Sequence, residues 1–249
     1  MSQTRDAGRG TRVESGDGEA GLRQDRTDLL LLSLGHTVTD VYSNYLPGLL
    51  VFLAVPLGLT NTLVGLLATI VSLSGSMSQL LFGFLADRVR HPYFLVIGPA
   101  AAAVFMSCLG RAHSVPALIA LLVLGGLSVA CFHPQASVAA GAGGGKSRGF
   151  NLALFVTAGS AGYSLGPIAA TWAAQRFGLE RMWLGALPGL LMGLALYATV
   201  YRRLRWDEGR GARDESGLSS ADSSPVPRPS SHRRHALWLL WGIVTLRSA

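Results

Sequence analysis

One face of a helix expected near the start of the chain carries three polar side chains that could exchange protons. His36, Asp40 and Asn44 recur every four residues within 29–55, where Asp40 is the only charged residue. Residues four apart share one face of a helix, and a carboxylate one turn from a histidine can bind and release a proton near neutral pH. We therefore expect His36 and Asp40 to carry or sense a proton whose binding is coupled to the activity of the protein. The alternative is a static polar contact between helices.

A second histidine occupies an apolar stretch further along the chain. His133 is the only histidine or charged residue within 114–145, and Pro134 follows it. The proline leaves the Ala130 carbonyl without its helical partner. His133 could therefore bind a polar or anionic substrate from a cavity wall, or it could be a buried histidine bonded to the backbone. Arg247, in the last apolar run, is a further candidate for attracting an anion.

The elements that must position these residues are long and apolar. Four stretches contain no Asp, Glu, Lys or Arg at all, namely 57–86, 92–110, 149–175 and 182–201. A helix of about 20 apolar residues crosses the hydrocarbon core of a bilayer. We therefore predict an all-α membrane protein whose transmembrane helices occupy 29–52, 60–86, 92–111, 115–140, 150–175 and 182–204.

The other segments complete the expected domain organisation. Residues 1–28 and 205–235 are polar and charged, as in a disordered cytoplasmic tail and a flexible cytoplasmic linker. A six-helix transmembrane bundle over 29–204 lies between them. Residues 236–249 are mostly apolar but too few to span a bilayer, so we expect a truncated seventh transmembrane helix. This is the layout of one half of a two-fold repeat transporter, whose partner would be a missing C-terminal half or another chain.

Positive charge alternates between the expected loops. Of the 21 Lys and Arg residues, 17 lie in the N-terminal tail or follow the second, fourth and sixth helices, against three on the opposite loops. Lys and Arg near helix ends stay on the cytoplasmic side. The pattern predicts a multi-pass protein of the cell (inner or plasma) membrane with a cytoplasmic N-terminus.

Two stripes of small residues indicate close helix packing. One stripe lies on the second expected helix and comprises Gly75, Gln79, Gly83 and Asp87. The other lies on the fifth and comprises Ala158, Gly162, Gly166 and Ala170, with Pro167 beside it. Small residues let neighbouring helices approach closely in a membrane, and Pro167 can bend its helix.

These residues carry a family resemblance. The run from Gly83 to Asp87 and Arg88 resembles the major facilitator superfamily signature between the second and third helices. The run from Gly162 through Gly166 to Pro167 resembles the Gly-Pro motif of proton-driven drug antiporters in that superfamily. Together with Gly35-His36, Asp40 and Phe132-His133-Pro134, these motifs make about 29–249 similar to the fosmidomycin-resistance group of exporters.

The resemblance implies a fold and a function. It implies half of a major facilitator fold, in which Gly83, Asp87 and Arg88 latch the two halves in the outward-facing state. It also implies proton-coupled export of a small polar or anionic compound such as an antibiotic, with lipid, protons and the substrate as partners and no cofactor. The chain departs from the pattern at Val89–Pro92, and at Gln135, where the group has an acid.

Other functions are disfavoured. The net charge of +7 is explained by topology signals and anionic lipid rather than by nucleic acid. Residues 140–147 resemble a nucleotide P-loop, but they join two expected membrane helices instead of following a strand. No motif of an enzyme or a metal site is recognised. The remaining alternatives are a proton-coupled metabolite importer and an inactive half-transporter, and we expect residues 1–249 alone to confer no drug resistance.

Overall fold

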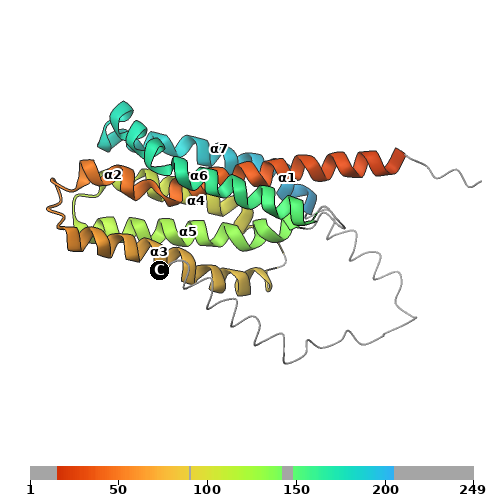
Figure 1. Cartoon of the computed structure of the whole chain (residues 1–249), viewed down its shortest axis with the longest axis horizontal. Helices are drawn as coiled ribbons and strands as arrows, with labels where there is room; N and C mark the ends of the chain where they lie inside the picture. Colours follow the sequence, from red (N-terminus) through yellow and green to blue (C-terminus); the bar gives the residue numbers. More distant parts are fainter. Residues whose placement is uncertain (1–15, 90, 142–147, 205–249) are drawn as a thin grey trace, which may run out of the picture.

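The computed structural model describes residues 16–89, 91–141 and 148–204, and the regular elements within them are all helical (Figure 1). The long helices lie side by side in one bundle. In chain order the elements are α1 (Gly16–Ser43), α2 (Tyr45–Leu53), α3 (Asn61–Ala86), α4 (Phe94–Ser107), η1 (Leu109–Arg111), α5 (Val115–Gly141), α6 (Arg148–Phe177), η3 (Leu179–Ala186), α7 (Leu187–Leu196) and η4 (Tyr197–Tyr201).

The bundle has the length and composition of a membrane domain. Five of the expected crossings are helical stretches long and apolar enough to span a bilayer: Asn61–Ala86, Phe94–Arg111, Val115–Gly141, Arg148–Phe177 and Leu179–Leu204. The other expected crossing, 29–52, is divided between α1 and α2. The chain is therefore an all-α, multi-pass membrane protein with a six-helix bundle. The expected linker and seventh helix, 205–249, lie outside the described residues.

The break between α1 and α2 has a local cause. Asn44 leaves the helical conformation, with φ −113° and ψ 30°. Pro47 lacks an N–H, and its ring would clash with the Ser43 carbonyl if the helix ran straight through. The single helix expected over 29–52 is therefore two helices, and the break places Asn44 beside the candidate site.

The beginning of α1 also differs from expectation. The helix starts at Gly16, whereas 1–28 was expected to be a disordered tail. Once a helix has formed, each further turn adds hydrogen bonds without a new nucleation cost, so the helix extends from the apolar region into the polar segment. Near the bundle, an ion pair between Asp28 and Arg203 (2.6 Å) joins α1 to the end of the last described helix. Residues 1–15 lie outside the described part.

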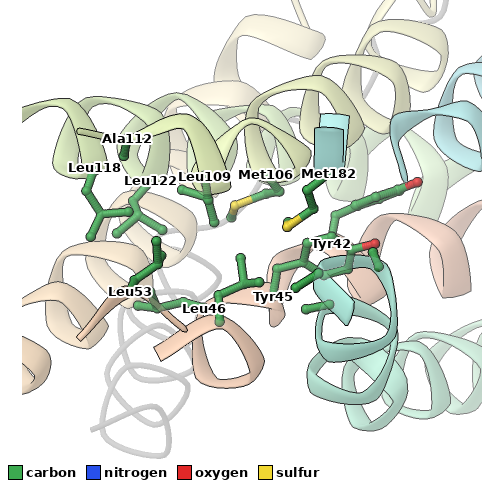
Figure 2. Close-up of a cluster of buried hydrophobic side chains, with 14 of the residues drawn as sticks. Tyr42, Tyr45, Leu46, Leu53, Met106, Leu109, Ala112, Leu118, Leu122 and Met182 are labelled. Atoms are coloured by element: carbon green, nitrogen blue, oxygen red, sulfur yellow. The ribbon is translucent and has the colours of Figure 1, made fainter. Parts of the chain in front are cut away.

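Two apolar clusters form the core. The first, which we call the outer cluster, centres on Tyr42, Tyr45, Met106, Leu122 and Met182 (Figure 2). The second, the inner cluster, centres on Leu32, Leu95, Phe132, Phe155 and Leu196. Along α1, His36 and Asp40 lie between the residues that enter the two clusters, so the polar side chains sit between two apolar layers.

Close backbone contact joins α1 to α6. A Cβ on Gly162 would fall on the Thr37 carbonyl, and a Cβ on Gly166 would crowd the Val41 carbonyl. The Thr37 hydroxyl donates to the Ala158 carbonyl at 2.9 Å. Because lipid tails are as apolar as a side-chain core, close approach and hydrogen bonds contribute strongly to association in a membrane. The small residues of α6 thus fix the helix that carries His36 and Asp40.

The α3 helix is packed differently. It lies mainly against α5, and Leu67 is its only buried residue. A Cβ on Gly65, Gly75 or Gly83 would meet nothing within 4 Å. Gly75 and Gln79 of the small-residue stripe instead line a cavity, and Gly83 has open space beside it in the described part of the chain.

Candidate functional site

A cavity of about 550 Å³ lies between α1, α2, α3, α5 and α6. Its lining is mixed, with apolar residues beside hydroxyl, amide and imidazole groups. The polar lining residues are Asp40, Ser43, Asn44, Ser72, Ser76, Gln79, His133 and Tyr163. Asp40 is the only carboxylate among the lining residues that the structure describes, and none of them is Lys or Arg. The cavity can therefore hold a small polar molecule next to a single acid.

His36 is held rigidly beside this cavity. Its Nδ1 lies 2.8 Å from the Phe155 carbonyl, and its ring stacks on the Phe155 ring with centroids 4.0 Å apart. A Cβ on Gly159 would fall on the imidazole, so only glycine leaves room for the ring there. The carbonyl and the stack together fix both the position and the orientation of His36.

Asp40 joins two histidines from different helices. Its Oδ2 lies 3.2 Å from His36 Nε2, one turn earlier on α1, and its Oδ1 lies 3.4 Å from His133 Nε2 on α5. The side chains of His36, Asp40 and His133 are 9%, 14% and 17% exposed. The His36–Asp40 pair expected from the sequence is therefore part of a cluster of three.

The geometry of this cluster favours a cation or a shared proton between His36 and Asp40. A carbonyl only accepts hydrogen bonds, so Nδ1 of His36 carries the hydrogen of that contact. In a neutral imidazole the other nitrogen, Nε2, is then an acceptor. Nε2 faces a carboxylate oxygen, which is also an acceptor when ionised. Two acceptors at 3.2 Å repel unless a proton or a metal cation lies between them.

Asn44 connects the break in the first crossing to the proline of α6. Pro167 has no N–H to donate to the Tyr163 carbonyl, four residues earlier. The Asn44 side chain donates to that carbonyl instead, at 3.0 Å. Freed carbonyls of membrane helices are tolerated when a neighbouring helix supplies a donor, and Asn44 supplies this one at the edge of the cavity.

Gln135 belongs to a different environment. Its Oε1 accepts from the Phe94 N–H at 3.0 Å, and its Nε2 donates to the His91 carbonyl at 3.4 Å. It therefore caps the start of α4 and does not extend the His36–Asp40–His133 cluster. The missing acid at this position leaves that cluster intact in this chain.

The expected latch residues lie away from the cavity. Asp87 ends α3 and is exposed, and its backbone N–H bonds to the Gly83 carbonyl. The Arg88 guanidinium lies over the Phe84 ring, 3.9 Å from its centroid. Neither Asp87 nor Arg88 has an ion-pair partner within the described ranges. Arg247, expected to face the cavity, lies outside those ranges.

Several residues of the site could not be singled out from the sequence. Phe155 contributes a backbone carbonyl and a ring, and neither role leaves a pattern in the chain. Gly159, by contrast, could have been found from the sequence. It precedes Gly162 and Gly166 by three and seven residues, which is a helical spacing, so the small-residue stripe indicated that Gly159 faces the same neighbouring helix. Ser72 and Ser76 line the cavity beside Gln79, which did belong to the stripe recognised on α3.

Comparison with known proteins gives the family. The model of the Major Facilitator Superfamily matches residues 32–248. The chain is 24% identical over 197 residues to the fosmidomycin resistance protein of Escherichia coli (strain K12), which covers 79% of this chain and 48% of that protein. It is 26% identical over 140 residues to the uncharacterized MFS-type transporter YfnC of Bacillus subtilis (strain 168), covering 56% of this chain and 34% of that protein.

Solved structures agree with this fold. A crystal structure of the peptide transporter POT in complex with alafosfalin superposes with a TM-score of 0.57 at 20% identity, covering 88% of this chain and 45% of that one. A structure of POT with sulfate gives the same TM-score. The chain spans less than half the length of each of these relatives and structures. The family model nevertheless covers most of this sequence, and the chain belongs to the Major Facilitator Superfamily.

Proposed function

We propose that this chain forms the N-terminal half of a proton-coupled transporter that exports a small polar or anionic compound, such as an antibiotic, in exchange for protons. The observation that carries the proposal is the contact between His36 Nε2 and Asp40 Oδ2 at 3.2 Å, beside a cavity of about 550 Å³. Ionisable groups inside a membrane domain are costly and mark ion or substrate pathways. The relative that confers fosmidomycin resistance supports an export role.

Exchange follows from competition between proton and substrate for the Asp40 carboxylate. A proton satisfies the facing acceptors of His36 and Asp40. A substrate that donates a hydrogen bond to Asp40 from the cavity stabilises the ionised carboxylate, whereas the proton neutralises it, so the binding of substrate and the binding of the proton oppose each other. Alternating access of two bundles about this site then carries the proton in one direction and the substrate in the other. An anionic part of the substrate would be held by a cation elsewhere, for which Arg247 is the candidate.

The orientation in the membrane is part of the proposal. The end of α3 and the start of α6, which adjoin Arg88 and Arg148, lie at the same end of the bundle (Figure 1). Arg111 in η1 and Arg181 in η3 belong to the connections at the other end. The heavier positive charge at the first end favours a cytoplasmic N-terminus in the inner or plasma membrane. Asp87 and Arg88 would then contact the second half from the cytoplasmic side.

Infrared difference spectroscopy tests the proton site directly. Spectra of the purified chain at acid and alkaline pH should show carboxyl and imidazole bands that change together. Asp40→Asn should remove the carboxyl change, because the amide cannot ionise. Glu180→Gln is the matched control, since Glu180 is exposed in η3 and does not line the cavity. An unchanged spectrum in Asp40→Asn would overturn the proton role.

Vesicle transport separates the remaining alternatives. Vesicles carrying the chain, with an internal pH-sensitive dye, receive fosmidomycin as the probe. Opposite movement of protons and probe supports the exporter. Movement in the same direction supports a proton-coupled importer. Proton binding without any transport supports a half that needs a second bundle, and this is the result expected for residues 1–249 alone.

A further inference from the structure

We propose that His36, Asp40 and His133 form a three-ligand site for a divalent transition-metal cation of the Zn²⁺ type on the cavity wall. The ligand atoms of these three side chains all lie within 4.8 Å of one another. The inference uses the same residues as the proton site, but it concerns equilibrium metal binding and does not depend on transport.

The spacing of the donor atoms matches a tetrahedral metal site. Zn²⁺ binds imidazole nitrogen and carboxylate oxygen at about 2.0–2.2 Å. In a tetrahedron with such bonds, two ligand atoms lie roughly 3.3–3.6 Å apart. The His36–Asp40 separation is 3.2 Å to Oδ2, and the His133–Asp40 separation is 3.4 Å to Oδ1. Each separation fits one edge of such a tetrahedron, and with one ligand atom from each residue the three atoms lie within 4.8 Å of one another. A bound cation would draw these donors closer together.

The orientation of His36 is that of a metal ligand. Metal-binding histidines usually donate their second ring nitrogen to a carbonyl or carboxylate, which fixes the tautomer and aims the other nitrogen. His36 Nδ1 makes this contact with the Phe155 carbonyl at 2.8 Å, and the ring is stacked on Phe155 above Gly159. Its Nε2 lone pair therefore points at Asp40 without any rearrangement.

The ligand types select the class of cation. Two imidazoles and one carboxylate suit Zn²⁺, Co²⁺, Ni²⁺ or Cu²⁺, whereas Mg²⁺ and Ca²⁺ prefer sites made of oxygen. Three protein ligands leave one tetrahedral position open. Asp40 and His133 line the cavity, so that position can take water or a donor atom of a cavity-bound molecule. A bound cation would also resolve the repulsion between the acceptors of His36 and Asp40.

Metal titration of the full chain in detergent, at constant near-neutral pH, tests the proposal. Zn²⁺ calorimetry should give one site per chain, and Co²⁺ should give the intense visible bands of a tetrahedral site. His133→Gln and Asp40→Asn should each weaken Zn²⁺ binding roughly tenfold or more, since even supporting residues of metal sites are worth that much. His113→Gln is the matched control, because His113 is exposed in the loop before α5, and it should bind as the parent chain does.

Three outcomes would overturn the metal site. Equal loss of affinity in His113→Gln and His133→Gln would show a nonspecific histidine effect, and unchanged affinity in both His133→Gln and Asp40→Asn would place the metal elsewhere. X-ray absorption of the Zn²⁺-bound parent chain decides the matter even if the variants do not fold. It should show two imidazoles and at least one oxygen, and a shell of oxygen alone contradicts the proposal. Loss of metal binding with an intact infrared proton signal would leave the proposed transport function standing.

Discussion

At the scale of single residues, the site is a polar cluster that is held in place by a backbone carbonyl and a glycine, neither of which forms a recognisable sequence motif. A carboxylate in the middle of a membrane helix costs about 2.5–3.5 kcal/mol on insertion scales, so Asp40 needs partners. His36 and His133 supply them at 3.2 and 3.4 Å. The Phe155 carbonyl fixes His36, and Gly159 leaves the space that its ring fills. The placement of the cluster therefore depends on a residue with no side chain.

Gly159→Ala should disturb the cluster while leaving the fold recognisable. The added methyl would fall on the His36 ring, and overpacking of this kind costs typically about 1–3 kcal/mol. We expect a lower unfolding temperature in detergent and an altered Asp40 band in the infrared difference spectrum. Gly149→Ala, on the same helix with nothing within 4 Å of its Cβ position, should not lower the unfolding temperature and should leave the Asp40 band unchanged. An unchanged Asp40 band in Gly159→Ala would contradict the placement of the ring.

Part of this site could be predicted from the sequence. The four-residue spacing of His36, Asp40 and Asn44 is enough to place them on one helix face. The contact of Asp40 with His133 could not be derived, because it joins residues 93 apart in sequence and depends on how α1 packs against α5. The role of Phe155 could not be derived either, since it acts mainly through its backbone carbonyl.

At the scale of elements, the break between α1 and α2 supplies a hydrogen bond that the proline of α6 removes. Asn44 leaves the helix and donates to the Tyr163 carbonyl, which Pro167 leaves without its helical donor. The sequence contains both Pro47 and Pro167, yet only the packing of the two crossings shows that they lie together. One irregular element thus supplies the hydrogen bond that the other lacks.

A double-mutant cycle should measure this compensation. Asn44→Ala removes the donor and should cost about 0.5–1.5 kcal/mol of unfolding free energy. Pro167→Ala supplies an N–H to the Tyr163 carbonyl, so Asn44→Ala should cost less in that background, with a coupling of about 0.5 kcal/mol or more. Unfolding in mixed micelles measures all four proteins. Strictly additive effects would show that Asn44 does not replace the bond lost at Pro167.

The two stripes of small residues should respond differently to the same substitution. A methyl on Gly162 would fall on the Thr37 carbonyl, whereas one on Gly83 would meet nothing within 4 Å. Gly162→Ala should therefore destabilise the bundle by about 1–3 kcal/mol. Gly83→Ala should be neutral or slightly stabilising, because alanine is the better helix former by about 0.5–1 kcal/mol. Comparable destabilisation in both variants, measured by unfolding in micelles, would mean that α3 is packed more tightly than this structure has it.

At the scale of the whole molecule, the sequence determined the number and type of crossings more securely than their ends. Long uncharged stretches require helices in lipid, because every backbone polar group must be satisfied within the segment. The start of α1 at Gly16 and the break at Asn44 were not predicted. Helix ends and breaks depend on local hydrogen bonds and packing, which a hydropathy pattern does not report. The alternation of positive charge along the chain also predicts which end of the bundle faces the cytoplasm. The fold alone does not indicate this orientation.

Cysteine labelling should determine that direction. In a background with Cys108 and Cys131 replaced by alanine, His113→Cys and Gly149→Cys place single thiols at exposed positions on opposite ends of the bundle. The basic residues beside Gly149 should hold the start of α6 in the cytoplasm, each contributing about 1 kcal/mol near an anionic surface. A membrane-impermeant maleimide should therefore label His113→Cys in intact cells and Gly149→Cys only after permeabilisation. The reverse pattern would place the basic end of the bundle outside, and with it the face on which Asp87 and Arg88 were proposed to contact a second half.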